Sequence, residues 1–371
     1  MKFTSARRIW LSVPFLVVLA QSVAQSQPAA PLQVERSIKL SFSTHRDVIL
    51  PSLPTIKEPV ALLHFDRSAQ RAAPTPLPRS VVSGGLTWVI QSSDTRVIDP
   101  GSGATATTSA LTSRSVRPDA IVHDGARGAI WLYGDALYRY QISTGELYRF
   151  RLASGPSGAI RKAVVRTAGV WLGTEGGALL FDAVAEAFRG VPQSNNARLV
   201  NATAAGPAVW LATEEPRLIK VTLAPSGRAN ITVSDKLPLG APAEMYGIDD
   251  TVWLLLSSDH GGAYRVAYLA GDRGQLELVA GRYFSLREDG GRLLAGTQTK
   301  VLVIDPRSKT AASRAVDPGE TPVGLSTAGV TFRGSSYSVK DPSEIVEQRP
   351  LDLSRGWSEP DLHATTAAAK R

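Results

Sequence analysis

Apolar residues recur along the middle of the chain in short runs, and turn-forming residues separate these runs. The clearest copy lies between Ala120 and Phe150, where four apolar or aromatic runs alternate with turns of Gly, Asp and Ser. Short runs rich in β-branched and aromatic residues predict strands rather than helices. We expect strands at 120–123, 129–133, 136–140 and 146–150, joined as an antiparallel meander.

A tryptophan marks the second run of successive copies of this pattern. The tryptophans are Trp88, Trp131, Trp171, Trp210 and Trp253, at intervals of 43, 40, 39 and 43 residues. Two later copies carry Leu294 and the pair Thr331–Phe332 at the same position, which makes seven copies between residues 79 and 350. A period near forty residues with an aromatic mark is typical of stacked or radial repeats.

One four-stranded sheet cannot bury both of its faces, so the copies are expected to pack face to face around an axis. We therefore predict an all-β fold, a single β-propeller of four-stranded antiparallel blades. Seven blades are expected, with eight as the alternative. The alternative rests on residues 60–66, which resemble the third strand of a blade. They are either part of an extra blade or a strand of the N-terminal extension that closes the ring. The tryptophans are predicted to fill the wedges between blades.

The ends of the chain differ from this repeat. Residues 1–24 have a basic start, an apolar stretch from Leu11 to Ala20 and small residues before Ala24. This pattern predicts a signal peptide cleaved after Ala24, because about ten apolar residues are too few to cross about 30 Å of hydrocarbon. Residues 25–78 are predicted to be a Pro-rich extension, wrapped or flexible, that contains a possible ring-closing strand. Residues 351–371 are predicted to be a flexible tail.

Composition narrows the class of protein further. The chain has no cysteine, which excludes disulfides and thiolate chemistry, and its formal net charge is +8. The basic residues are scattered rather than clustered, so nucleic acid is not an expected partner. An Ala- and Arg-rich composition behind a signal peptide indicates a bacterial protein that is periplasmic or secreted, with no transmembrane insertion.

Two phrases resemble known repeats. Residues 170–182 read Val-Trp-Leu-Gly-Thr-Glu-Gly-Gly-Ala-Leu-Leu-Phe-Asp, which resembles the two-component-regulator type of propeller repeat. Residues 137–145 are similar to that repeat and to quinoprotein-like propellers. The resemblance implies blade architecture, and in sensor proteins such repeats imply an extracytoplasmic ligand-binding region. Because propellers host many unrelated activities, it does not imply a particular activity.

Carboxylates follow the tryptophan strands at similar offsets. Asp135, Glu175 and Glu214 stand four residues after their tryptophans, and Asp94 and Asp259 stand six after theirs. These turns would lie on one face, so we predict an acidic collar that favours cations or a basic partner segment. Ordinary turn chemistry is the alternative.

The longest of these loops, residues 257–262, carries Asp259 and His260, with Glu214 and Glu215 expected nearby. The candidate ligand-binding residues are Asp94, Asp135, Glu175, Glu214, Glu215, Asp259 and His260.

No catalytic residue, metal ligand or cofactor is predicted, because no two of the five histidines have metal-ligand spacing. The leading hypothesis is a non-catalytic binding or scaffold module for a protein, peptide or glycan, with membership of an envelope complex as a further possibility. The alternative is a lyase, lactonase or hydrolase with a divalent ion in the axial funnel. The funnel candidates are Asp124, Asn201, Asp249 and Glu288, and His123 beside Asp124 is a possible general base.

Overall fold

In the computed structural model, the described residues form an all-β protein. They are residues 27–62, 80–83, 86–90, 95–98, 105–107, 118–154, 158–257, 264–270, 274–283, 285–289, 291–297, 300–315, 322–326, 329–332, 335–341 and 344–350. Their helical structure is a 3-10 turn at Pro192–Ser194. No helix among them has the length and apolar character needed to span a membrane. The predicted signal peptide and C-terminal tail lie outside these residues.

The described strands form seven antiparallel sheets, numbered here along the chain. Each of sheets 1 to 4 contains four strands that are consecutive along the chain. Sheet 1 contains β6 (Ser80–Ser83), β7 (Leu86–Ile90), β8 (Thr95–Ile98) and β9 (Thr105–Thr107), and sheet 2 contains β10 (Pro118–Asp124), β11 (Ala129–Gly134), β12 (Leu137–Gln141) and β13 (Glu146–Leu152). Sheet 3 contains β14 (Ile160–Arg166), β15 (Gly169–Thr174), β16 (Gly177–Asp182) and β17 (Ala187–Gly190), and sheet 4 contains β18 (Leu199–Ala205), β19 (Ala208–Thr213), β20 (Leu218–Leu223) and β21 (Ala229–Ser234).

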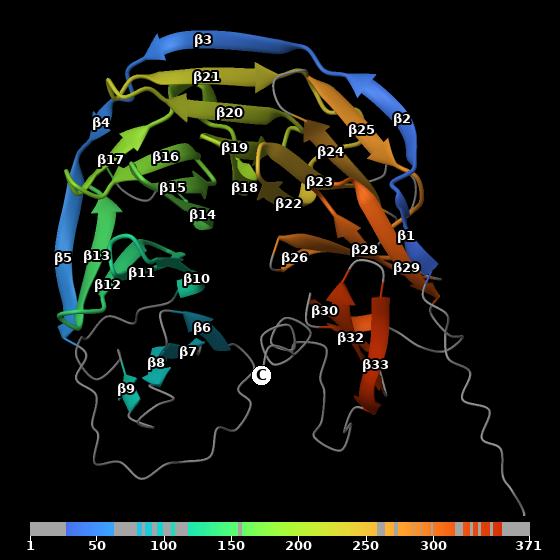
Figure 1. Cartoon of the computed structure of the whole chain (residues 1–371). Coiled ribbons are helices and arrows are strands. Elements are labelled where there is room, and N and C mark those ends of the chain that lie inside the picture. The colour runs from blue at the N-terminus through green and yellow to red at the C-terminus, as the bar shows by residue number, and fades with distance from the viewer. Residues whose placement is uncertain are drawn as a thin grey trace, which may run out of the picture.

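Sheet 5 contains β22 (Pro242–Ile248), β23 (Thr251–Ser257), β24 (Tyr264–Ala270) and β25 (Gln275–Val279). Sheet 6 contains β26 (Ser285–Asp289), β27 (Arg292–Gly296), β28 (Lys300–Asp305) and β29 (Thr310–Ala315). Sheet 7 contains β30 (Pro322–Ser326), β31 (Gly329–Phe332), β32 (Ser335–Asp341) and β33 (Glu344–Pro350). The sheets follow one another around an open centre, and the first strand of each lies nearest that centre (Figure 1). The predicted strands of the repeat are confirmed to within a few residues.

Each sheet has two ends, which define two faces of the molecule. Because consecutive strands are antiparallel, turns alternate between the ends. Face 1 carries the turns between the first and second strands and between the third and fourth strands. Face 2 carries the turns between the second and third strands and the links between sheets.

Four of the five repeat tryptophans fill wedges between sheets, as predicted, and the side chain of Trp88 lies outside the described part of the structure. Trp131, Trp171, Trp210 and Trp253 are at most 3% exposed. Each packs in a cluster with side chains of the following sheet, as Trp131 does with Ile160 and Leu172. Replacing such a buried ring by alanine costs about 3–5 kcal/mol, so the tryptophans belong to the core.

The N-terminal segment, residues 27–62, forms a belt on the outside of five sheets. Its strands are β1 (Gln27–Pro31), β2 (Val34–Lys39), β3 (Phe42–Val48), β4 (Ser52–Leu53) and β5 (Thr55–Leu62). They pair antiparallel with the outer strands of sheets 6, 5, 4, 3 and 2, in that order. The belt runs along the outer wall in blue in Figure 1, opposite to the later course of the chain. The described part of residues 60–66 therefore adds to sheet 2 and does not begin a further sheet.

Apolar side chains attach the belt to the core. Leu40 and Leu50 are 6% and 4% exposed and pack into the clusters around Trp210 and Trp171. Leu53 and Val60 are partly buried against the clusters of sheets 2 and 3. The belt strands contain prolines and charged residues, such as Pro59 and Glu58, which are residue types that discourage further pairing at a sheet edge.

Candidate functional site

The structure places four of the seven candidate residues. Asp135, Glu175, Glu214 and Glu215 lie in the second-to-third strand turns of sheets 2, 3 and 4, on face 2. These turns were predicted to lie on one face, and the antiparallel order of the strands places them all on face 2. Asp94, Asp259 and His260 lie outside the described residues, so the proposed role of the 257–262 loop stays a prediction.

Arginines join the carboxylates of sheets 3 and 4 into one chain of exposed ion pairs. Arg161, at the start of β14, contacts Glu175. Arg198, in the link before β18, lies 3.9 Å from Glu175 and 3.0 Å from Glu214. The side chains are between 36% and 58% exposed. We call Arg161, Glu175, Arg198 and Glu214 the rim chain.

The ion pairs of Glu175 affect the acidity of its carboxylate. A hydrogen bond from Arg161 holds the pKa of Glu175 below its usual value, and the positive charge of Arg198 acts in the same direction. Glu175 is therefore ionised throughout the neutral range, with two arginines beside it.

The other turn carboxylates on face 2 also have basic partners. Glu215 lies 3.3 Å from Arg217. Asp135 accepts hydrogen bonds of 3.0 and 3.2 Å from the Tyr138 hydroxyl and lies 3.5 Å from Arg149. Burial, followed by the negative charge of Asp135, raises the pKa of Tyr138. Face 2 is therefore mixed in charge over these sheets, and is not the purely acidic collar expected from the turn residues alone.

The arginines of the rim chain were absent from the sequence-based site. Arg161 and Arg198 precede the carboxylates that they contact by 14 and 16 residues, on different elements. The turns that follow each tryptophan contain the carboxylates, whereas the two arginines come from a first strand and from a link between sheets. The one sequence feature that could have indicated them is their position, because Arg161 lies within a first strand and Arg198 just before one.

On face 1, the Asp124 carboxylate is a buried structural group. Asp124 is 1% exposed and accepts hydrogen bonds from Trp131 Nε1 at 3.0 Å and from the Arg127 guanidinium at 2.8 Å. Arg127 also donates to the Arg166 and Thr167 carbonyls of sheet 3. The exposed His123 has no part in these contacts, so the Asp124 carboxylate serves to join two sheets.

The remaining funnel candidates also make local contacts. Asn201 donates to the Ala243 carbonyl at 3.1 Å and so links sheets 4 and 5. Asp249 pairs with Arg307 of sheet 6 at 2.9 Å, and Glu288 accepts a 2.8 Å hydrogen bond from the Gly291 amide. Within the described ranges, no three His, Asp or Glu side chains converge in a way that could hold a metal ion.

Comparison with known proteins gives similarity of fold alone. No family model matches the chain, and no curated protein matches it. Among solved structures, it is similar to PorZ, an essential surface component of the type-IX secretion system of Porphyromonas gingivalis, with a TM-score of 0.49 and 11% identity over 78% of this chain and 39% of that one.

A second similar structure is the extracellular domain of a hybrid two-component system from B. thetaiotaomicron, with a TM-score of 0.42 and 15% identity over 64% of this chain and 34% of that one. A third is AztD from Citrobacter koseri, with a TM-score of 0.47 and 14% identity over 73% of this chain and 87% of that one. The chain thus spans 39% and 34% of the length of the first two proteins. At 11–15% identity and TM-scores of 0.42–0.49, these similarities concern the fold alone.

Proposed function

We propose that this protein is an exported, seven-bladed β-propeller that binds a partner protein or peptide through face 2 and catalyses no reaction. The observation that carries the proposal is the rim chain, in which exposed arginines and carboxylates alternate across two neighbouring sheets. On face 1, by comparison, the Asp124 carboxylate is buried and joins two sheets, although the exposed pair of Asp249 and Arg307 also lies on that face.

The rim chain is not needed to hold the fold. Exposed ion pairs stabilise a protein by about 0–1 kcal/mol, because water screens them and long side chains lose freedom. A series of such pairs on turns of a rigid scaffold is instead suited to recognition. A partner segment with both charges can replace the internal pairing with intermolecular pairs, and arginine is enriched in protein interfaces. We therefore favour a polypeptide partner over a glycan.

Export forms part of the same proposal. Residues 1–24 carry the signal pattern, and the belt begins at Gln27, soon after the expected cleavage site. N-terminal sequencing of protein recovered from the periplasm or medium should give a chain that begins at Gln25. A chain that retains Met1 in those fractions would contradict cleavage after Ala24.

A capture experiment tests the role of face 2. The wild-type protein, the double variant E175K/E214K and the control D250K are immobilised and exposed to envelope extract from the source cells. Asp250 is an exposed carboxylate in the first turn of sheet 5, on face 1. We expect the wild type and D250K to retain the same partner and E175K/E214K to lose it. Equal recovery by all three proteins would overturn the proposal.

Metal analysis tests the competing enzyme hypothesis. A stoichiometric divalent ion in the purified full chain would favour a lyase, lactonase or hydrolase with a metal in the axial funnel.

A further inference from the structure

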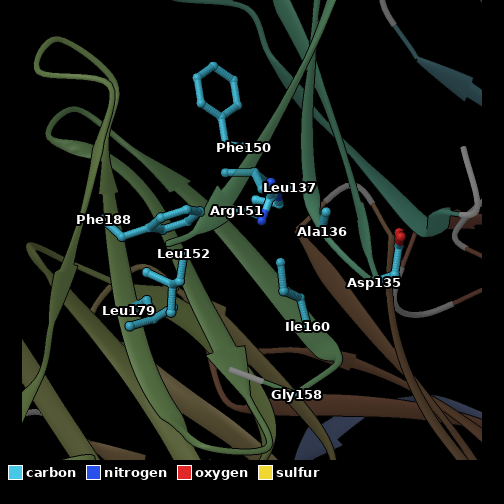
Figure 2. A pocket seen from close by; sticks show the side chains of 10 residues that line it. All are labelled: Asp135, Ala136, Leu137, Phe150, Arg151, Leu152, Gly158, Ile160, Leu179 and Phe188. Carbon is cyan, nitrogen blue, oxygen red and sulfur yellow. The ribbon is translucent and has the colours of Figure 1, made fainter. Parts of the chain in front are cut away.

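Face 2 has a small apolar pocket between sheets 2 and 3. Its volume is about 30 Å³, and side chains from both sheets line it: Leu137, Phe150 and Leu152 from sheet 2, and Ile160, Leu179 and Phe188 from sheet 3. These side chains come from β12 and β13 on one side and from β14, β16 and β17 on the other, and Figure 2 shows the Phe150 ring directed away from Ile160. The pocket therefore lies where two sheets meet beside the turns that carry the candidate site.

Charged groups of opposite sign stand beside this pocket. Asp135 and Arg151 border it, and their side chains are 47% and 42% exposed. Asp135 lies at the edge of the group in Figure 2, away from the apolar side chains. Each has an internal partner, since Asp135 accepts from Tyr138 and Arg151 donates to Glu58. Their exposure leaves further oxygen lone pairs and guanidinium N–H groups open to a ligand.

The pocket adjoins the rim chain through Gly158. This residue lines the pocket and has a φ of +82°. A Cβ at Gly158 would lie only 2.6 Å from the Glu175 Cβ, so the glycine and Glu175 are in close contact. Pocket and rim chain consequently form one continuous strip across sheets 2, 3 and 4.

We propose that this strip binds an extended partner segment that places one small aliphatic side chain in the pocket and charged residues of both signs along the rim chain. The inference deepens the proposed function and rests on it. A volume of about 30 Å³ exceeds the roughly 10–15 Å³ that one water-sized group needs, so the pocket admits a small aliphatic group. The occupant is then a small aliphatic side chain, such as that of alanine or the tip of valine.

The charges at the pocket suit a peptide backbone. Asp135 accepts a hydrogen bond from a peptide N–H, and Arg151 donates one to a peptide carbonyl. These two hydrogen bonds would hold the partner backbone on either side of the small residue, while the methyl group of that residue is buried in the pocket. The alternating signs of Arg161, Glu175, Arg198 and Glu214 then select charged residues further along the segment.

The test begins with selection of a displayed random nine-residue peptide library on the full-length wild-type protein at low salt. Selected peptides are synthesised, and their affinity is measured by fluorescence anisotropy. We expect an alanine or valine flanked by residues of both charges. The variant A136L fills the pocket from its edge, where Ala136 is buried. It should weaken binding about tenfold, while A136S should bind like the wild type. L152F is a second filling variant, and thermal melting confirms that each variant is folded.

The variants separate the two proposals. If E175Q/E214Q weakens binding but A136L and L152F do not, the rim chain binds the partner and the pocket proposal is wrong. If none of these variants changes the affinity, both proposals are wrong. Selection of peptides without a small aliphatic residue would also overturn the pocket proposal.

Discussion

The two faces of this propeller use the same residue types in different ways. On face 1, Asp124 is 1% exposed and receives hydrogen bonds from Trp131 and Arg127. Arg166 likewise donates to the Gly206 and Ala208 carbonyls of the next sheet. On face 2, the arginines and carboxylates of the rim chain are at least 36% exposed and are bonded mainly to one another.

This difference in burial leads us to expect that the buried polar groups contribute to stability and that the exposed rim chain is available to a partner. A buried carboxylate with fixed donors is costly to disturb, because its partners lose their hydrogen bonds in a place that water does not reach. An exposed ion pair costs little to break, so it is free to exchange with a partner. Substitutions of buried groups such as Asp124 on face 1 should therefore change the free energy of unfolding, and substitutions in the rim chain on face 2 should change binding.

The largest effect is expected from D124A. Removing the carboxylate leaves the Trp131 indole N–H and the Arg127 guanidinium without their buried acceptor. We expect the free energy of unfolding to fall by about 4 kcal/mol. Chemical denaturation of D124A and of the wild type measures it, and a loss below about 1 kcal/mol would contradict the role given to Asp124.

The variant G247A tests the close approach of first strands near face 1. A Cβ at Gly247 would lie 1.7 Å from the Ala204 carbonyl oxygen, and the Gly247 amide donates to Thr203 Oγ1 at 2.8 Å. The strands must separate to admit a methyl group, so we expect a loss of about 3 kcal/mol by denaturation. Alanine at Gly227, where a Cβ would meet no atom within 4 Å, is the control for overpacking. Its positive φ of 77° adds backbone strain only. Equal losses would show that overpacking is not the cause.

A pair of tryptophan variants sharpens the comparison within the core. The Trp131 indole donates to Asp124, whereas the buried Trp253 Nε1 has no hydrogen-bond partner among the described residues. Both W131F and W253F lose ring area, but only W131F loses a hydrogen bond to a charged group. We expect W131F to be less stable than W253F by about 2 kcal/mol. Equal stabilities would contradict the importance of the indole–carboxylate bond.

Acid should weaken the fold through carboxylates such as Asp182 on face 1. Burial alone would raise its pKa, but hydrogen bonds from the Ala185 and Val184 amides and the charge of Arg189 lower it below 3.8. The stabilisation is therefore present above the unfolded pKa and is lost as pH falls through the folded value. At pH 7, D182N should be less stable by about 1 kcal/mol, and the difference should shrink below pH 4. A difference independent of pH would contradict this assignment.

The smallest effect on stability is expected from E175Q/E214Q. These side chains are 36% and 58% exposed, so their loss should change the free energy of unfolding far less than D124A does. Thermal and chemical denaturation check this, and a loss as large as that of D124A would remove the distinction between the faces.

The sequence predicted the strands well because the repeat is local. Each tryptophan phrase and each glycine turn determines its own strand, so the copies around Trp131 and Trp171 emerged without long-range information. The belt was expected as a wrapped or flexible arm with one possible ring-closing strand. Its strands pair with distant residues, from Leu62 with Glu146 to Gln27 with Ser313, and no local pattern encodes that pairing.

The candidate site was predicted only in part, for a similar physical reason. The turn carboxylates occupy a fixed place in the repeat, so Glu175 and Glu214 could be found by alignment. Their arginine partners and the pocket arise where neighbouring sheets meet, and these depend on how the sheets pack. Leu152 and Leu179 lie on different sheets and show no pattern that joins them.

The central claim is that face 2 meets the partner and face 1 does not, and site-specific photo-crosslinking in the source cells tests it most directly. A photoreactive residue replaces Glu214 on face 2 or Val184 on face 1, where Val184 is 91% exposed and so equally accessible. We predict a discrete crosslinked partner from position 214 and none from position 184. The same partner from both positions, or from position 184 alone, would contradict the account.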